Sequence, residues 1–455
     1  MYVLKRAVVI GAGIGGLTAA QALAGKFEEV LILEENVSSN AALYRTGVPQ
    51  GKHPHFLLAG GLEALNLLFD DITASLLDAG AVESDMGNVS YDFPGQETLP
   101  QRALGIPLLT CTRPLLEAVL RDRLQRRKDI RLLEGRRVVE IFPTADWSSV
   151  KAVRCQTREH KDEIYEAELV VDASSRGDST IDFLRSTGRP LPPKTTIGVD
   201  YSYLTANLEF PEGGEPAFQM MMALPNAPYN SRTGKILVQE KKKILALIGG
   251  RGEDAPPLVW PAFVNYVSTL VSPNLGKALA NAVSYGKPRQ FLFRESRRRH
   301  YERILDWPDG LIPIADAICR VNPVYGHGMA AASKEAVVLR DLMEQRQFHP
   351  QPQAGFFKVF MNAVNPMLDD IWLLSAIPDL AYADTRGSPP DNLWELLSIN
   401  IATHRAAILD ADIHKLLFEV ISLLKPSSEL RKEAVAEKIS RLANQLHLSG
   451  KHANP

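Results

Sequence analysis

Long apolar runs and cysteines are scarce in this sequence. No stretch approaches the ~20 apolar residues in a row that a membrane-spanning helix needs. The chain enters an apolar strand almost at once, which leaves no basic-then-apolar signal peptide. Three cysteines, Cys111, Cys155 and Cys319, are too few and too scattered for a disulfide framework or a zinc site, which favours a reducing compartment. We therefore expect a cytoplasmic protein with no transmembrane segment.

A strong net charge and familiar arrangements of catalytic side chains are also missing. The formal net charge of −2 provides no electrostatic attraction to nucleic acid. We find no Ser/His/Asp arrangement, no paired acid and base carboxylates and no metal-ligand spacing. Lys52, His53 and His55 stand together, but no further ligand is spaced to complete a metal site. The sequence therefore predicts neither a nucleic-acid partner nor a bound metal.

The chain is longer than a single hydrophobic core usually supports, and at 455 residues we expect two or three domains. Helical spacing, strand-like alternation and turn signals divide it into four segments. In order, these are the first part of a nucleotide-binding domain at 1–180, a β-rich substrate-binding domain at 181–289, the last part of the nucleotide-binding domain at 290–350 and a helical C-terminal region at 351–455. The nucleotide-binding domain is therefore expected to be discontinuous.

A glycine turn near the N-terminus carries the first functional signal. Gly11, Gly13 and Gly16 stand in G-x-G-x-x-G order between an apolar strand at 7–10 and an alanine-rich helical run at 17–24. Gly11 permits the sharp turn, Gly13 lets the backbone approach a pyrophosphate, and Gly16 lets helix and strand pack closely. The helix N-terminus would then face phosphate. This context predicts a dinucleotide site.

The next apolar strand, at 30–35, ends near an acidic residue. Glu34 lies 23 residues beyond Gly11 (34 − 11). An acid at this position accepts hydrogen bonds from the hydroxyls of an adenosine ribose and repels a 2′-phosphate. The sequence therefore favours FAD or NAD over NADP.

A second strand, glycine loop and helix start occur at 312–333, far along the chain. The apolar strand ends in Asp316, and glycines bracket the loop before the helix. One long ligand with a pyrophosphate in its middle and a redox ring at its end would need two such anchor points from distant sequence. The two loops together favour FAD.

At this point the residues resemble a known family, the FAD-dependent monooxygenases of the aromatic-hydroxylase-like superfamily, in the branch that contains polyether and squalene-type epoxidases. The resemblance spans nearly the whole chain. The segments that carry it are GAGIGG at 11–16, GVPQGKHPHFLLAGGLEAL at 47–65, TRPLLE at 112–117, LVVDASSRG at 169–177, RRHYERILDWPDGL at 298–311, ADAICRVNPVYGHGM at 315–329 and ADTRGSP at 383–389. It implies an α/β fold with a discontinuous Rossmann-like FAD-binding domain, a β-sheet substrate domain and a helical C-terminal region.

The resemblance also implies cofactor contacts. Asp316 would bind the ribityl chain of FAD. Pro323, Gly326, Gly328 and Met329 would line the pyrimidine edge of the flavin. At this edge the N-terminus of a helix supports the negative charge of the reduced ring.

Two arginines and two departures complete the comparison with the family pattern. Arg113 resembles the family's contact to the FAD phosphates, and Arg45 matches a position where an arginine often reaches the cofactor. Ala315 replaces the usual glycine before Asp316, and SSRG at 174–177 replaces the usual TGRG. The extra methyl of Ala315 bears on the backbone path there, but we expect FAD binding to survive.

The implied activity is insertion of one oxygen atom from O2, through a flavin C4a-hydroperoxide, into a hydrophobic alkene-bearing or polycyclic intermediate of secondary metabolism, with epoxidation ahead of hydroxylation. The alternative is a flavin-dependent dehydrogenase or reductase of an isoprenoid or polyketide. A flavin halogenase is less favoured because the W-x-W-x-I-P motif is absent, and a nucleotide-binding scaffold is the non-enzymatic alternative. No second dinucleotide fingerprint is present, so either NAD(P)H reduces the FAD from a surface groove or a partner flavin reductase does.

The substrate pocket has several candidate residues. They are Tyr201 and Tyr203 on one strand face, Phe218, Met220 and Met222 on a methionine-rich strand, and Trp372 on a C-terminal helix. Each also fits an ordinary core position. His327 is the one catalytic candidate, and it fits either proton transfer or a loop-stabilising hydrogen bond.

Overall fold

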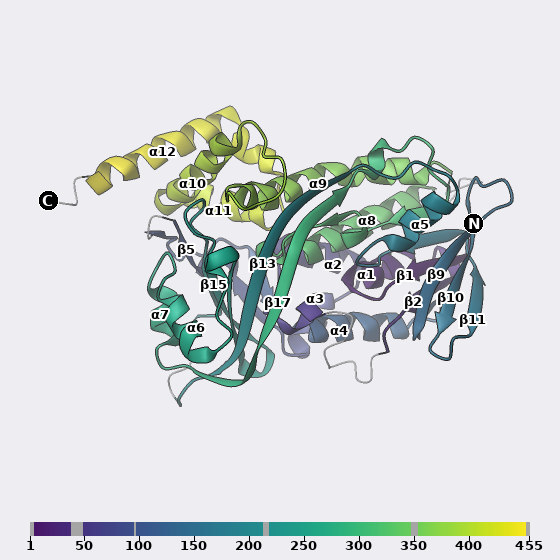
Figure 1. The fold of residues 1–455 in the computed structure, drawn as a ribbon, viewed down its shortest axis with the longest axis horizontal. Coiled ribbons are helices and arrows are strands. Elements are labelled where there is room, and N and C mark those ends of the chain that lie inside the picture. Colours follow the sequence, from purple (N-terminus) through teal and green to yellow (C-terminus); the bar gives the residue numbers. More distant parts are fainter. Residues whose placement is uncertain (1–3, 38–48, 95–96, 213–217, 347–353, 452–455) are drawn as a thin grey trace.

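The computed structural model describes residues 4–37, 49–94, 97–212, 218–346 and 354–451. Figure 1 shows an elongated molecule with helices α10, α11 and α12 at one end, a parallel sheet at the other, and two long strands, β13 and β17, running between them. Among the described residues, no helix is long and apolar enough to cross a membrane.

A five-stranded parallel sheet forms the nucleotide-binding part. Its central strands are mostly buried apolar runs, as expected for a parallel sheet covered on both faces, and the edge strand at Ile130–Glu134 is only partly buried. In spatial order they are β18 (Leu311–Pro313), β12 (Leu169–Asp172), β1 (Leu4–Ile10), β2 (Phe27–Glu34) and β8 (Ile130–Glu134). Because β18 joins the sheet from late in the chain, both ends of the sequence build one unit.

Three helices pack together beside this sheet. The helix α1 (Ile14–Leu23) contacts β1, β2 and β12, and it packs against α8 (His327–Arg346), on which α2 (Ala59–Leu68) packs as well. Almost every residue of α1 is buried, and its small alanine and glycine side chains permit that close packing. The helix α3 (Ile72–Asp78) follows α2 after a short turn, and its N-cap residue Asp71 has a left-handed backbone (φ 53°).

An eight-stranded mixed sheet forms the β-rich part. Its order is β19 (Cys319–Arg320), β17 (Val283–Arg299), β13 (Lys194–Glu209), β16 (Lys243–Gly250), β15 (Thr233–Gln239), β14 (Met220–Ala223), β5 (Ser90–Phe93) and β6 (Glu97–Thr98). Two short helices, α6 (Trp260–Val267) and α7 (Asn274–Leu279), pack on it around a separate hydrophobic core. The edge strands β19 and β6, together with β5 next to β6, come from sequence outside the β-rich segment, so residues from both sides of that segment complete its sheet.

Smaller elements complete this half of the molecule. An antiparallel sheet of β9 (Arg136–Pro143), β10 (Val150–Thr157) and β11 (Asp162–Glu166) lies beside the parallel sheet, together with α5 (Asp178–Ser186). The helix α4 (Arg113–Gln125) follows a second three-stranded sheet of β3 (Phe56–Leu57), β7 (Pro107–Thr110) and β4 (Val82–Asp85).

The C-terminal region is helical, as the sequence predicts. It consists of α9 (Phe356–Leu380), α10 (Leu393–Leu409), α11 (Ala411–Ile421) and α12 (Glu433–Lys451). The helix α9 packs against α8 and β13, so it reaches the border between the two sheets. The expected fold class, a discontinuous α/β unit with a β-sheet part and a helical C-terminal region, is confirmed.

Candidate functional site

One large cavity lies where the parallel sheet meets the β-rich part. Its volume is about 1160 Å³, above the roughly 300–1,000 Å³ typical of a pocket for one small ligand. Gly13 from the first glycine turn and Gly328 from the second both line it. The cavity begins at the carboxyl ends of β1, β2 and β12, which is where open α/β sheets bind their ligands.

Most of the residues expected to bind the cofactor line this cavity. They are Gly11, Gly13, Glu34, Arg113, Asp316, Pro323, Gly326, Gly328 and Met329. Gly16 has a packing role instead, because a Cβ there would lie 1.9 Å from the carbonyl oxygen of Gly11. Arg45 lies outside the described residues.

The first glycine turn presents a bare helix N-terminus to the cavity. Gly11 has a left-handed backbone (φ 93°), and Gly13 precedes α1 without any side-chain cap. A Cβ at Gly13 would contact only Nη2 of Arg113, at 3.6 Å. The space in front of this helix is therefore open, and its unpaired N–H groups suit an anion.

Glu34 holds the turn and faces the cavity at the same time. Its Oε2 accepts a hydrogen bond from the N–H of Ala12 at 2.8 Å, and its Oε1 accepts from the backbone and side-chain nitrogens of Asn36, both at 2.9 Å. The side chain is 6% exposed. This bonding fixes the carboxylate at the end of β2, where a ribose would lie.

Two arginines of α4 approach the glycine turn. The Nε of Arg113 donates to Oε1 of Glu117 at 2.9 Å, which orients its guanidinium toward Gly13. Arg121 donates to the carbonyl oxygen of Ala12 at 3.0 Å and pairs with Glu134 at 2.9 Å. Sequence reasoning missed Arg121, although it lies eight residues after Arg113 on the same helix.

Asp316 is a half-buried carboxyl group on the cavity wall. Among the described residues no hydrogen-bond donor reaches its carboxylate, and burial raises its pKa although Arg320, Arg113 and Arg297 oppose this. Its neighbour Ala315 has a left-handed backbone (φ 55°), a conformation that glycine adopts more readily than alanine. The N–H of Ala315 donates to Glu335 Oε2 at 2.6 Å, and this bond holds the strained turn in place.

The segment SSRG at 174–177 forms the turn after β12, and the hydroxyl of Ser174 holds this turn together. Oγ of Ser174 donates to Oδ1 of Asp172 at 2.6 Å and accepts from the N–H of Gly177 at 3.0 Å. Asp172 also accepts from the N–H and hydroxyl of Thr180 at 3.0 and 2.7 Å. Ser174 and Thr180 therefore supply hydrogen bonds to both oxygens of the buried Asp172 carboxylate.

His327 starts α8 but is not among the described residues that line the cavity. Burial lowers its pKa to about 4, so the ring is neutral near pH 7. Its Nε2 lies 3.2 Å from the carbonyl oxygen of Ile421 in α11, to which it donates. Of the two roles considered from the sequence, this geometry favours the structural hydrogen bond.

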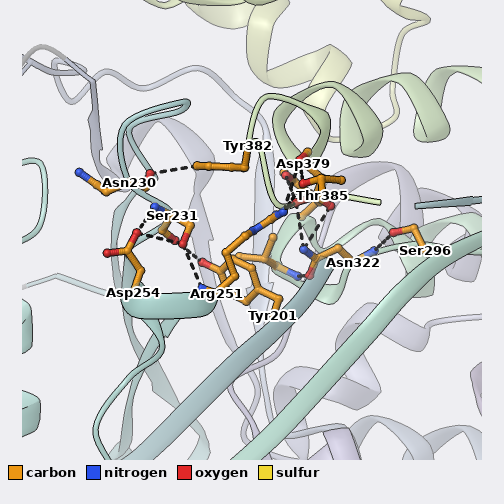
Figure 2. Close-up of polar contacts among 12 residues, drawn as sticks. Tyr201, Asn230, Ser231, Arg251, Asp254, Ser296, Asn322, Asp379, Tyr382 and Thr385 are labelled. Atoms are coloured by element: carbon orange, nitrogen blue, oxygen red, sulfur yellow. Dashed lines mark hydrogen bonds and ion pairs between the residues drawn. The ribbon is translucent and has the colours of Figure 1, made fainter. Parts of the chain in front are cut away.

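A buried polar network supports the second loop from behind (Figure 2). Nη2 of Arg251 pairs with Oδ1 of Asp379 at 2.7 Å, and each side chain is 3% exposed. Nδ2 of Asn322 donates to Asp379 at 3.3 Å, Tyr325 donates to it at 3.3 Å, and Oδ1 of Asn322 accepts from Tyr203. The end of α9 is thereby connected to the loop that carries Pro323.

The predicted pocket residues separate in the structure. Tyr203 lines the large cavity, whereas Tyr201 lines a separate space of about 30 Å³ and donates to the carbonyl oxygen of Ser231 at 2.7 Å. The other four candidates are not among the described residues that line the large cavity. They pack into hydrophobic cores instead: Met220, Met222 and Trp372 in or against the largest core, and Phe218 against the core of the β-rich part.

The outer wall of the cavity is mostly aromatic and was not anticipated from the sequence. It includes His53, Phe56, Lys235, Phe291 and Phe293. Burial lowers the pKa of His53 to about 4, and its Nδ1 lies 2.7 Å from Oγ1 of Thr205. The neutral imidazole therefore belongs to the apolar wall, where its ring packs against Phe291.

Comparison with known proteins finds one curated relative and many solved structures. Protein Rv3254 of Mycobacterium tuberculosis (strain ATCC 25618 / H37Rv) is 26% identical over 408 residues, which cover 85% of this chain and 83% of that protein. No protein-family model matches the chain.

Three solved structures illustrate the similarity in fold. A flavoprotein/dehydrogenase from Cytophaga hutchinsonii has a TM-score of 0.69 at 13% identity and covers 99% of this chain and 100% of its own. The flavin-dependent brominase Bmp2 has a TM-score of 0.65 at 13% identity, with 98% and 99% covered. PqsL of Pseudomonas aeruginosa, in complex with 2-aminobenzoylacetate, has a TM-score of 0.64 at 14% identity, with 84% and 97% covered. The chain therefore has the fold that these flavin-associated proteins share.

Proposed function

We propose that this protein is an FAD-dependent monooxygenase. The observation that carries the proposal is that Gly13 and Gly328, from opposite ends of the chain and each next to a helix N-terminus, line one continuous cavity. A ligand with a pyrophosphate and a distant redox ring fits two such anchor points. The flavin-dependent brominase and the flavoprotein that share the fold support the same cofactor.

The residues of the cavity fit FAD. The glycine turn and Arg113 offer backbone N–H groups and a positive charge to a pyrophosphate, and Glu34 is fixed beside them for the adenosine ribose. Asp316 presents a carboxylate for hydroxyl groups of the ribityl chain. Arg45 remains part of the proposal from the sequence alone.

Bound FAD would supply the redox and oxygen chemistry, and the chain would control its surroundings. The N-terminus of α8, at Gly328 and Met329, would stabilise negative charge at the pyrimidine edge, where each such contact contributes about 0.3–2 kcal/mol. The aromatic wall around Phe291 and Phe293 would exclude water and orient an apolar substrate.

The finer parts of the proposal concern substrate and electron source. We infer a small substrate with a large apolar part, for which epoxidation is favoured over hydroxylation, and O2 as co-substrate. The FAD would be reduced by NAD(P)H or by a partner flavin reductase. A flavin-dependent dehydrogenase or reductase is the second candidate, which the flavoprotein/dehydrogenase of the same fold supports.

The experiment begins with the purified protein and FAD. We expect a yellow protein whose melting temperature rises with FAD, because a ligand that binds only the native state stabilises it. NAD(P)H oxidation is then measured without and with an added flavin reductase, and candidate polyenes or polyketides are tested for incorporation of one atom of labelled O2. A colourless protein whose melting temperature does not change when FAD is added would contradict the proposal. Turnover without incorporated oxygen would favour the dehydrogenase.

Asp316→Ala is expected to lower FAD affinity about 10- to 100-fold while the circular-dichroism spectrum stays that of a folded protein. This range corresponds to the roughly 1.5–3 kcal/mol of a hydrogen bond to a charged group. FAD content is measured after gel filtration. The control is Asp391→Ala, which removes an exposed carboxylate outside the cavity. Equal FAD content in both variants would reject the role of Asp316.

A further inference from the structure

Lys235 is a positive charge buried in the wall of the cavity. It lies in the middle of β15, between Gly234 and Ile236, and is 5% exposed. A lysine is rarely buried to this degree unless it is paired. Its Nζ donates to the carbonyl oxygen of Val324 at 2.5 Å and lies 5.3 Å from the centre of the Phe56 ring.

The ammonium group has donors to spare. It carries three N–H groups, and Val324 accepts one of them. No ion pair joins Lys235 to any carboxylate in the described part of the chain. Asp379, which lines the same small space of about 30 Å³ as Lys235, is already paired with Arg251 at 2.7 Å.

Lys235 lies where a ligand in the large cavity can reach it. The side chain lines both the large cavity and the small one behind it. Burial lowers its pKa to about 8, so the amine is still mostly protonated at neutral pH. An apolar wall with one buried cation attracts a ligand that carries an anion, because the low dielectric strengthens their attraction.

We infer that Lys235 binds an anionic oxygen, a carboxylate or an ionised phenol, on a substrate whose apolar body packs against Phe56 and Phe291. The inference rests on the proposed function and makes its substrate class narrower. A wholly neutral hydrocarbon would leave the ammonium buried without a counter-ion once water is excluded, which costs several kcal/mol in similar settings. An acidic substrate supplies that counter-ion.

Matched pairs of small probes test this with the FAD-loaded protein. Benzoate is compared with benzamide for a carboxylate, and 4-nitrophenolate with 4-nitroanisole for a phenolate, by isothermal titration calorimetry. We expect the wild-type protein to bind at least one anion about tenfold or more tightly than its neutral counterpart. Lys235→Met should reduce that preference to near one. Lys194→Met, which changes an exposed lysine of the same sheet, should keep it.

Other outcomes would overturn the inference. Equal affinities within both pairs for the wild type, binding of no probe at millimolar concentration, or an anion preference that survives Lys235→Met would each reject an anion site at this residue. Loss of FAD or a shifted flavin midpoint potential in Lys235→Met, with the preference intact, would assign the lysine to the cofactor.

The inference can fail separately from the proposed function. Methionine is about as long as the lysine stem and removes an unpaired charge, so we expect the melting temperature of Lys235→Met to match or exceed that of the wild type. If methionine disturbs the wall, Lys235→Gln is the second neutral variant. If the protein binds no FAD at all, the proposed function fails, and the same titrations on the FAD-free protein still decide the role of Lys235.

Discussion

Gly13→Ala is expected to fold normally and lose FAD, whereas Gly16→Ala is expected to lose the fold around the turn. Both changes add one methyl group to the same motif, three residues apart. At Gly13 the new Cβ would contact only Arg113, at 3.6 Å, so the protein itself has room for it. The methyl would occupy the side of the turn that a pyrophosphate must approach.

At Gly16 the new methyl has no room in the protein itself. Its Cβ would lie 1.9 Å from the carbonyl oxygen of Gly11 and 2.9 Å from the carbonyl carbon, both of them backbone atoms. Relief requires α1 to move away from β1, and α1 is buried along nearly its whole length. Overpacking of a close-packed core typically costs about 1–3 kcal/mol, and more where the backbone must shift.

The measurements are thermal unfolding by circular dichroism and FAD content after gel filtration. Gly276→Ala on α7 is the control, because its Cβ would only touch Val267 at 3.9 Å and the residue does not line the cavity in the described part of the protein. We expect it to retain both fold and FAD. A Gly13→Ala variant with full FAD content would mean that no ligand approaches the first turn closely.

Asp379→Ala is expected to lower the free energy of unfolding by about 3–5 kcal/mol, the usual loss when one partner of a buried ion pair is removed. Arg251 would keep its charge at 3% exposure, with a hydrogen bond to Thr385 at 2.5 Å and the ring of Tyr382 at 4.5 Å as remaining side-chain contacts. Asn322 would lose its bonds to Asp379 at 3.3 and 3.4 Å in the same step. The loss therefore reaches the loop before Pro323 as well as the end of α9.

Urea unfolding of four proteins measures this effect: the wild type, Asp379→Ala, Arg251→Met and the double variant. Because the double variant leaves no unpaired charge, we expect it to be more stable than Asp379→Ala alone. Asp122→Ala is the control, since its pair with Arg126 has side chains 57% and 67% exposed. Exposed helical pairs contribute about 0.3–0.5 kcal/mol. Similar losses for Asp379→Ala and Asp122→Ala would refute a structural role for the buried pair.

Features set by local spacing could be read from the sequence. The strand, glycine turn and helix around Gly13 form a continuous segment, and the end of β2 at Glu34 follows from a simple apolar run. The alanine at position 315, where the resemblance predicts glycine, coincides with a left-handed backbone next to Asp316. These predictions needed no knowledge of long-range contacts.

Features that depend on distant contacts could not be read in this way. Strand alternation places Tyr201 and Tyr203 on one face, but only Tyr203 reaches the large cavity, because Tyr201 lies toward the smaller space behind it. Met220 and Met222 are of a residue type that fits a substrate pocket, but their side chains are buried in the hydrophobic core. The pairing of Arg251 with Asp379 joins residues 128 positions apart, and no local sequence pattern predicts it. The one sequence signal for Lys235 is its position as a charged residue within an apolar strand.

The distribution of the cavity residues along the chain has a consequence for how the protein matures. Gly13 belongs to the first turn, Lys235 to the middle, and Asp379, which fixes the loop behind the cavity, to the last quarter. His327 is held in addition by the carbonyl oxygen of Ile421. A nascent polypeptide can therefore form its early strands and helices on the ribosome, but the contacts that support the second loop are complete only after α9 and α11 have emerged. Cofactor capture should accordingly be one of the last events of its biogenesis.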